Sequence, residues 1–105
     1  MKTANIERAE AKLREADQWR ARFLQGVHEV RMLKVRMRTY ARILSEAAHQ
    51  GVPGGPLTRL WKIERWLHDQ RLIVLQNMRS SLDCASASDH AARILYAHDE
   101  GWNVL

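Results

Sequence analysis

Apolar residues recur through the first half of the chain at the spacing of a coiled-coil helix. Their positions advance alternately by four and three residues: Trp19, Phe23, Gly26, Val30, Leu33, Met37, Tyr40, Leu44 and Ala47. The same spacing continues upstream through smaller residues: Ile6, Ala9, Leu13 and Ala16. This alternation aligns its members along one face of an α-helix and predicts a coiled-coil seam. No proline interrupts the segment, so we expect one helix over about residues 3–49.

A helix of that length outreaches a small domain. We therefore expect one of three arrangements: a projecting N-terminal third, a kink at Gly26, or a second copy paired along the helix. The helix ends at a cluster of glycine and proline, Gly-Val-Pro-Gly-Gly-Pro over residues 51–56. This composition predicts a reversal of direction over residues 50–56. Gly51 suits the left-handed conformation that closes a helix, and Pro56 suits the first turn of the next one.

A second helix is predicted over about residues 57–82. Its apolar residues form one face with a flank beside it: Leu60, Ile63, Leu67, Val74 and Met78 on the face, and Leu57, Leu75 and Leu82 on the flank. The run from Leu72 to Leu75 is apolar on every side of a helix. It needs neighbours on more than one side, from a third helix or from a second subunit. This run and the arm from Ile6 to Ala16 predict self-association.

The chain after the second helix predicts a short third one. Residues 85–88 are small and serine-rich and are interpreted as a joint, followed by a helix over about residues 89–99 that Ser88 or Asp89 caps. Gly101 would close it. The alternative is that the second helix continues through the joint. With 105 residues, enough for one domain and too few for two, we expect a single all-α domain over residues 1–105. Its fold is a long antiparallel helical hairpin with a short third C-terminal helix.

The formal net charge is +5, and the positive charge is concentrated in the middle of the chain. Residues 18–45 carry seven bases against Glu29 alone, whereas residues 83–105 carry Arg93 against four acids. Such asymmetry indicates a polyanionic partner. The alternative is that the arginines only keep a helix in solution.

Five bases fall on one flank of the apolar seam when the chain is placed on a helix at about 100° per residue. They are Arg20, Arg31, Lys34, Arg38 and Arg42. Like charges three or four residues apart repel by a few tenths of a kcal/mol per pair. An anionic partner would offset that repulsion. Acids of the C-terminal segment, from Asp89 to Glu100, are the internal alternative.

Tryptophan adds a second feature to this basic segment. Trp19 lies on the seam, whereas Trp61 lies beside Arg65 on one side of the second helix and Trp66 lies with Arg59 and Lys62 on the other. Rings among bases suit stacking on unpaired nucleotides, and equally suit anchoring a protein interface. The candidate nucleic-acid-binding residues are Arg20, Arg31, Lys34, Arg38, Arg42, Arg59, Trp61, Lys62, Arg65 and Trp66.

No motif for catalysis, metal or cofactor appears, and we expect no enzyme. The five histidines lack the paired spacing of a helical zinc site, and residues 51–56 lack the lysine of a phosphate-binding loop. A single cysteine, Cys84, forbids an intramolecular disulfide and fits a reducing compartment. The charged segment Met1 to Arg14 does not resemble a signal peptide, and no apolar run approaches the roughly 20 residues of a membrane span. These features predict a cytoplasmic protein without a membrane partner.

In its size, its helical single-domain build and its lack of a catalytic motif, the chain resembles the small inhibitors of bacteriophages and plasmids, anti-CRISPR proteins in particular. The resemblance covers general character, and no motif aligns from which a functional residue could be transferred. Many such inhibitors are acidic and look like mimics of nucleic acid. Arg31, Lys34, Arg38 and Arg42 depart from that pattern. The resemblance therefore implies contact with nucleic acid, or with an acidic protein surface, rather than mimicry.

Two functions follow as expectations. The first is a non-enzymatic protein that binds nucleic acid, single-stranded DNA above all or RNA, or a nucleoprotein complex, in an inhibitory or accessory role. The alternative is a coiled-coil adaptor or homodimer whose basic face contacts an acidic protein partner. A helix-turn-helix regulator is less favoured, because that motif needs short helices joined by a tight turn.

Overall fold

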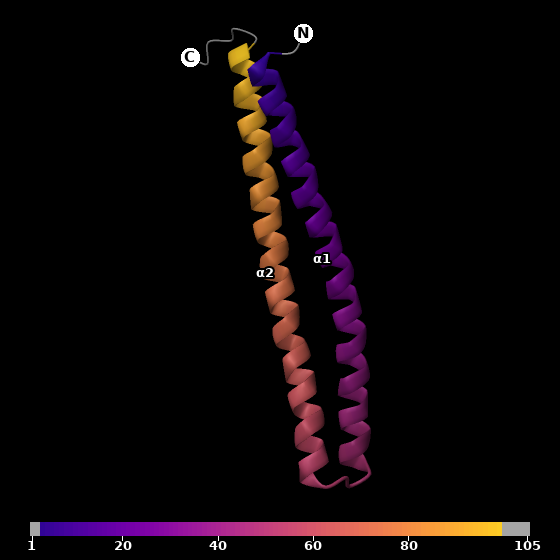
Figure 1. The fold of residues 1–105 in the computed structure, drawn as a ribbon. Helices are drawn as coiled ribbons and strands as arrows, with labels where there is room; N and C mark the ends of the chain where they lie inside the picture. Colours follow the sequence, from indigo (N-terminus) through magenta and orange to yellow (C-terminus); the bar gives the residue numbers. More distant parts are fainter. Residues whose placement is uncertain (1–2, 100–105) are drawn as a thin grey trace. The chain divides into compact units, whose positions relative to one another are not determined.

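The computed structural model describes residues 3–99 and consists of two long α-helices that form a hairpin (Figure 1). Helix α1 spans Ala4–His49 and helix α2 spans Gly54–Asp99. Over these residues the chain contains no strand. The all-α hairpin is as predicted, and α1 continues through Gly26. Neither helix holds a stretch apolar enough, at sufficient length, to cross a membrane.

Helix α1 begins with a threonine cap. The backbone amide of Ile6 donates a hydrogen bond to Thr3 Oγ1 at 3.2 Å, and the amide of Glu7 donates to the Thr3 carbonyl at 3.1 Å. The hydroxyl thus satisfies one of the amides that have no partner inside the first turn. Glu7 places a carboxylate near the positive end of the helix dipole. Thr3 also donates a hydrogen bond from its hydroxyl to the carboxylate of Asp99.

The turn between the helices is a Schellman motif centred on Gly51. Gly51 has a φ of 70°, in the left-handed region that glycine enters without steric cost. Its amide donates to the Ala48 carbonyl at 3.2 Å, and the amide of Val52 reaches back to the Ala47 carbonyl at 3.0 Å. These two bonds satisfy carbonyls that the end of α1 would otherwise leave free. The predicted role of Gly51 is confirmed.

Helix α2 begins at Gly54, three residues before the predicted start at Leu57. Pro56 is the third helical residue, and a missing N–H costs nothing there because the first amides of a helix lack partners anyway. The first intrahelical bonds come at once: the Leu57 amide donates to Pro53, and Thr58 Oγ1 donates to the Gly54 carbonyl at 2.8 Å. The predicted turn over 50–56 is thus shorter than expected.

The separate third helix is not present, because α2 continues without interruption to Asp99. Two of the four residues interpreted as a joint, Ala85 and Ser88, face inward, whereas Ser86 and Ala87 between them are exposed. Ser81, Ala85, Ser88 and Ala92 are buried and advance by four, three and four residues, which is the spacing of a seam. They do not interrupt the helix, because serine and alanine are tolerated where packing against the partner helix supplies the stability. Gly101, the predicted terminator, lies outside the described residues.

The hairpin divides into two compact units, each built from both helices. The open-end unit comprises 1–25 and 78–105, of which residues 3–25 and 78–99 are described. The loop-end unit comprises Gly26–Asn77 and is described in full.

In the open-end unit the buried seam is made of small side chains. Ala9 and Ala16 of α1 are completely buried, and Ala85 and Ala92 of α2 are almost completely buried. Small residues at the contact allow two helices to approach closely. The two backbones can then exclude water from the seam although no large side chain fills it. Leu82, predicted to flank the apolar face, is exposed, and its neighbour Ser81 lies in the seam.

In the loop-end unit large side chains form the seam, yet few of them are covered. The predicted α1 seam is confirmed, since Val30, Leu33, Met37, Tyr40, Leu44 and Ala47 are all half-buried. On α2 the seam runs through Leu57, Leu60, Glu64, Leu67, Arg71 and Val74. Ile63, expected on this face, is exposed, because the seven-residue repeat places Glu64 at the seam. Leu67, 2% exposed, is the one large apolar side chain fully buried among residues 26–77.

Replacing Gly51 by alanine should destabilise the protein by about 1 kcal/mol, because a Cβ at positive φ is strained whatever space surrounds it. Gly55→Ala is the matched control: it lies within α2 with open space around it, so it should stabilise by about 0.5 kcal/mol. Urea denaturation at one fixed protein concentration measures both. Equal effects of the two substitutions would contradict the left-handed turn.

Enlarging the small-residue seam should also destabilise. Ala16→Leu forces a branched side chain between the helices of the open-end unit and should cost about 1–3 kcal/mol. Ala21→Leu on the exposed face of the same helix should change stability by less than about 0.5 kcal/mol. Thermal unfolding followed by circular dichroism compares the two. A harmless Ala16→Leu would show that the helices do not approach closely there.

Candidate nucleic-acid interface

The loop-end unit presents two flanks, one on either side of its seam. In the seven-residue repeat of a coiled coil, labelled a to g, the seam occupies a and d, positions e and b lie on one flank, and g and c lie on the other. In an antiparallel pair, e adjoins e of the partner helix and g adjoins g. The structure agrees with this register: Leu44 and Ala48 of α1 line one hollow together with Leu57 and Trp61 of α2.

One of these sides, the basic flank, carries most of the predicted cations. It consists of Arg31, Lys34 and Arg38 from α1, with Trp61, Arg65 and His68 from α2, all at positions e and b. Arg42 borders it at position f. We use the name for these seven residues throughout.

The three α1 cations of the basic flank are exposed and have no acidic partner. Within residues 3–99 no carboxylate lies within 4.0 Å of the charged atoms of Arg31, Lys34 or Arg38. Arg42 is only weakly engaged, with its Nε 4.0 Å from Glu46 Oε1 on the same helix. The internal alternative, neutralisation by acids of the C-terminal segment, therefore does not apply to these four positions. Their charge is available to an anion from outside.

Trp61 lies on the same flank and is half exposed, at 50%. The guanidinium of Arg65 lies over its ring, 5.7 Å from the centroid, within the range of a cation–π contact. A shallow hollow of about 400 Å³ beside the ring is lined by Trp61, Glu64, Arg65, His68 and Asp69. The exposed aromatic ring offers a surface on which a base can stack.

Glu64 and His68 form a polar pair within this hollow. His68 Nε2 lies 3.6 Å from Glu64 Oε1, one turn away on α2. This ion-pair contact of Glu64 therefore lies within α2. Glu64 and Asp69 also bring negative charge to the hollow, whereas the unpaired cations of the basic flank lie on α1.

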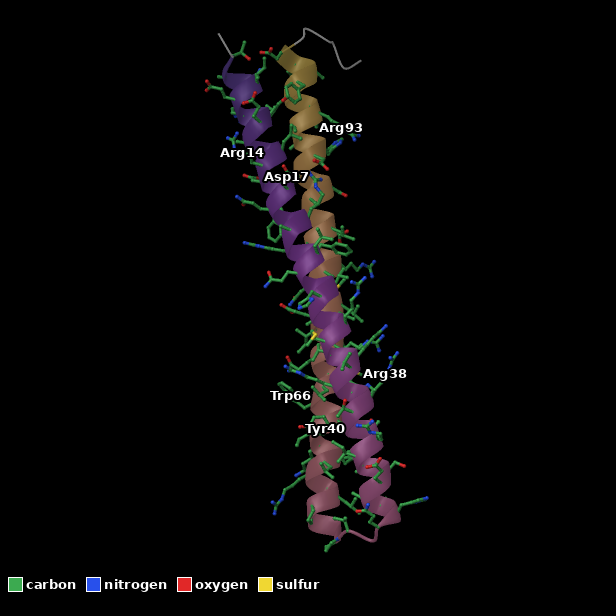
Figure 2. The ribbon with its side chains drawn as sticks, turned by 90° about the vertical axis from the view of Figure 1, so that its right-hand side faces the viewer. Arg14, Asp17, Arg38, Tyr40, Trp66 and Arg93 are labelled. Carbon is green, nitrogen blue, oxygen red and sulfur yellow. The ribbon has the colours of Figure 1, made fainter. Side chains whose placement is uncertain are left out.

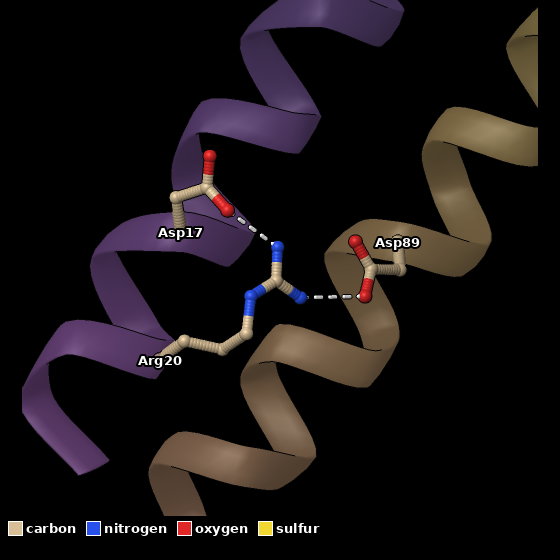
Figure 3. A network of polar contacts seen from close by, with 3 residues as sticks. All are labelled: Asp17, Arg20 and Asp89. Carbon is tan, nitrogen blue, oxygen red and sulfur yellow. Dashed lines mark hydrogen bonds and ion pairs between the residues drawn. The ribbon is translucent and has the colours of Figure 1, made fainter. Parts of the chain in front are cut away.

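Arg20 belongs to the open-end unit and is already engaged within it (Figure 3). Its Nη2 donates to Asp17 Oδ1 at 2.6 Å and its Nη1 donates to Asp89 Oδ2 at 2.8 Å. The second bond crosses from α1 to α2. For Arg20 the internal alternative is correct, because an acid of the C-terminal segment pairs with one of the five predicted bases beside the seam.

The two hydrogen bonds, first that of Asp17 and then that of Asp89, raise the pKa of Arg20 above its ordinary value, and desolvation opposes them only in part. A folded-state pKa above the unfolded value favours the folded protein at all pH values below the titration of the guanidinium. The contribution is therefore present at neutral pH and is lost as the guanidinium titrates in strong alkali. In the same unit, the guanidinium of Arg22 lies over the ring of Trp19, 4.4 Å from the ring centroid.

The remaining candidates do not lie on the basic flank. Trp66 and Arg59 occupy position c of α2, on the opposite flank, and Lys62 occupies the outward position f. Figure 2 shows Arg38 and Trp66 toward opposite edges of the hairpin. A single strand that follows the basic flank from Arg31 to Arg42 and on toward the turn would therefore meet Trp61 and not Trp66.

Sequence reasoning missed two polar seam residues, Glu64 and Arg71. The Nε of Arg71 is buried and has no hydrogen-bond partner within the described part of the chain. The signal that could have found them is the seven-residue series Leu57, Glu64, Arg71 and Met78, which choosing the apolar Ile63 as a face residue conceals. Across residues 3–99 no group of three histidine, cysteine or acidic side chains is placed to hold a metal ion.

No model of a known protein family matches the chain, and neither does a curated protein or a solved structure. The assignment of the basic flank therefore depends on the chemistry of its own residues.

Proposed function

We propose that the protein binds single-stranded nucleic acid through the basic flank of its loop-end unit. The observation that carries the proposal is the juxtaposition of three exposed, unpartnered cations, Arg31, Lys34 and Arg38, with a half-exposed tryptophan on the same flank. Cations that track a backbone and an aromatic ring that accepts a base are the two components of sequence-tolerant single-strand binding.

Electrostatics accounts for most of the expected affinity. Lys34, Arg38 and Arg42 follow one another at intervals of four residues, so their side chains rise by about 6 Å at each step along α1. Their mutual repulsion destabilises the free helix slightly. A phosphate backbone beside them removes that repulsion and releases its own condensed counterions. Arginine adds bidentate contacts to phosphate oxygens.

Trp61 supports a preference for unpaired strands. A base can stack on its exposed ring only when the base is free of its partner, whereas a duplex offers the flank phosphates alone. DNA and RNA both satisfy these requirements, and single-stranded DNA remains the first candidate. An inhibitory or accessory role in a nucleoprotein complex, as in the anti-CRISPR proteins that the chain resembles, is the biological setting we propose for this binding.

The protein should shift single-stranded oligonucleotides at low salt with little sequence preference. If three or four phosphates are neutralised, affinity should fall about 20- to 50-fold between roughly 50 and 200 mM salt. Reversing Arg31, Lys34, Arg38 and Arg42 to glutamate should abolish the shift and leave the helical circular dichroism spectrum unchanged, because these side chains lie outside the seam. Absence of binding to single strand, duplex and RNA at 50 mM salt would exclude the proposal. A pull-down with an acidic protein as bait would then test the adaptor alternative.

Trp61→Ala should weaken single-strand binding by about 5- to 150-fold, which corresponds to about 1–3 kcal/mol for one stacked base. Duplex binding should change much less, since no base is free to stack. Trp61→Phe is the matched control and should retain most of the affinity, because it keeps an aromatic face. Fluorescence anisotropy with labelled oligonucleotides measures all three. Equal losses on single strand and duplex would show that the ring does not stack.

Arg20→Gln should leave nucleic-acid affinity within about twofold of the original, because its guanidinium is engaged with Asp17 and Asp89. The same substitution should lower the midpoint of thermal unfolding, since it removes a contact between the helices. Arg38→Gln should do the opposite, weakening binding while leaving the midpoint unchanged. If Arg20→Gln lost as much affinity as Arg38→Gln, Arg20 would have to be part of the nucleic-acid interface.

A further inference from the structure

We propose that the second flank of the loop-end unit binds the same flank of a second copy of this chain, in an antiparallel arrangement about a two-fold axis. This apolar flank consists of the residues at positions g and c: Glu29, Met32 and Arg36 of α1 with Ile63, Trp66, Gln70 and Ile73 of α2. The proposal does not depend on nucleic-acid binding, because the basic flank lies on the other side of the seam.

The first support is the lack of a core in the loop-end unit. Two helices share a single seam, and among residues 26–77 only Leu67 is a fully buried large side chain. Helices in proteins are stabilised chiefly by the packing of an apolar face, and units of this size are marginal even with a complete core. The unit therefore needs apolar contacts beyond those that the hairpin itself makes.

The apolar flank carries exposed side chains that can make such contacts. Its large side chains are strongly exposed: Met32 46%, Ile63 39%, Trp66 56% and Ile73 48%. Exposed tryptophan and methionine side chains beside apolar ones are typical of the core of a protein interface. Between the helices lies a hollow of about 290 Å³, lined by Met32, Leu33, Trp66 and Val74 among others.

The charges on the rim of this hollow are self-complementary. Glu29 and Arg36 both line it, occupy the same heptad position seven residues apart, and have no ion-pair partner within residues 3–99. In a two-fold interface residue i meets residue j and j meets i. An axis that crosses α1 between Met32 and Leu33 brings Glu29 of each copy to Arg36 of the other.

The same axis also pairs the apolar residues of α2. Gln70 lines the hollow together with Met32 and Leu33, so the axis crosses α2 near Gln70. Trp66 and Ile73 stand almost equally far from Gln70 on either side, and both occupy position c. The axis therefore sets Trp66 of one copy against Ile73 of the other. One symmetry operation thus satisfies both the charges of α1 and the exposed side chains of α2, which is why we infer a second copy rather than an unrelated protein.

Charge reversal tests this geometry without nucleic acid. Sedimentation velocity of the full chain at about 0.1 M salt should show a dimer at micromolar concentration. Glu29→Arg places arginine opposite Arg36 at both ends of the interface, and Arg36→Glu places glutamate opposite Glu29. Each variant alone should dimerise about 10- to 30-fold more weakly than the original chain. An equimolar mixture should recover dimerisation, because every arginine then meets a glutamate of the other variant.

Two controls keep the result interpretable. Each variant should retain the helical circular dichroism spectrum, and Arg38→Glu on the basic flank should dimerise as the original chain does. A monomer at about 100 µM, undiminished dimerisation of the single variants, or a mixture that remains monomeric would each overturn the proposal. Because the assay contains no oligonucleotide, its failure is distinguishable from failure of nucleic-acid binding.

Discussion

A hairpin of two helices has one seam, and that constraint governs the rest of this structure. Each helix can bury only the stripe that faces its partner, so an apolar residue even one position away from the stripe remains in water. The loop-end unit shows the consequence most clearly, because Trp61, Trp66 and Ile73 stay about half exposed beside a seam that covers Leu67 almost completely. The surface properties of the protein follow from what the seam leaves uncovered.

The two units use the seam differently. In the open-end unit small residues such as Ala9, Ala16 and Ala92 allow close approach, and an ion-pair network through Arg20 joins the two helices at its edge. In the loop-end unit the seam contains larger side chains and two polar ones, Glu64 and Arg71. Close packing of small side chains needs no further partner, whereas half-covered large side chains do. This difference places both proposed interfaces in the loop-end unit.

The register of the helices separates two kinds of surface within that unit. Positions e and b collect Arg31, Lys34 and Arg38 together with the exposed Leu72, whereas positions g and c collect Met32, Trp66 and Ile73. The seam between them keeps a polyanion on one flank apart from a protein contact on the other. A dimer through the apolar flank would leave both basic flanks accessible, so the two proposals are physically compatible although neither requires the other.

The sequence by itself determined the hairpin of two long helices, the turn and the α1 seam from Trp19 to Ala47, whereas Leu13, expected to continue that seam, is exposed. A repeat of four and three residues has only one helical solution, and Gly51 followed by two prolines leaves the chain only one place to reverse. The sequence did not determine the α2 seam. Ile63 and Leu82 look like core residues by hydrophobicity, and the serines near residue 85 look like a joint. A polar or small residue enters a seam when the partner helix leaves it no other position, and only the pairing of the two helices shows this.

The candidate site divides in the same way. The excess of bases near the middle of the chain is visible in the sequence, because net charge is a property of composition. Which bases are free is decided by tertiary structure. Arg20 resembles Arg38 in the sequence, yet Asp89, 69 residues further along the chain, accepts a hydrogen bond from Arg20. Trp61 and Trp66 resemble each other equally well, and they lie on opposite flanks because five residues correspond to more than one turn of a helix. The contact with Asp89 decides the outcome for Arg20, and no local pattern encodes it. The separation of the two tryptophans, in contrast, follows from helical spacing alone.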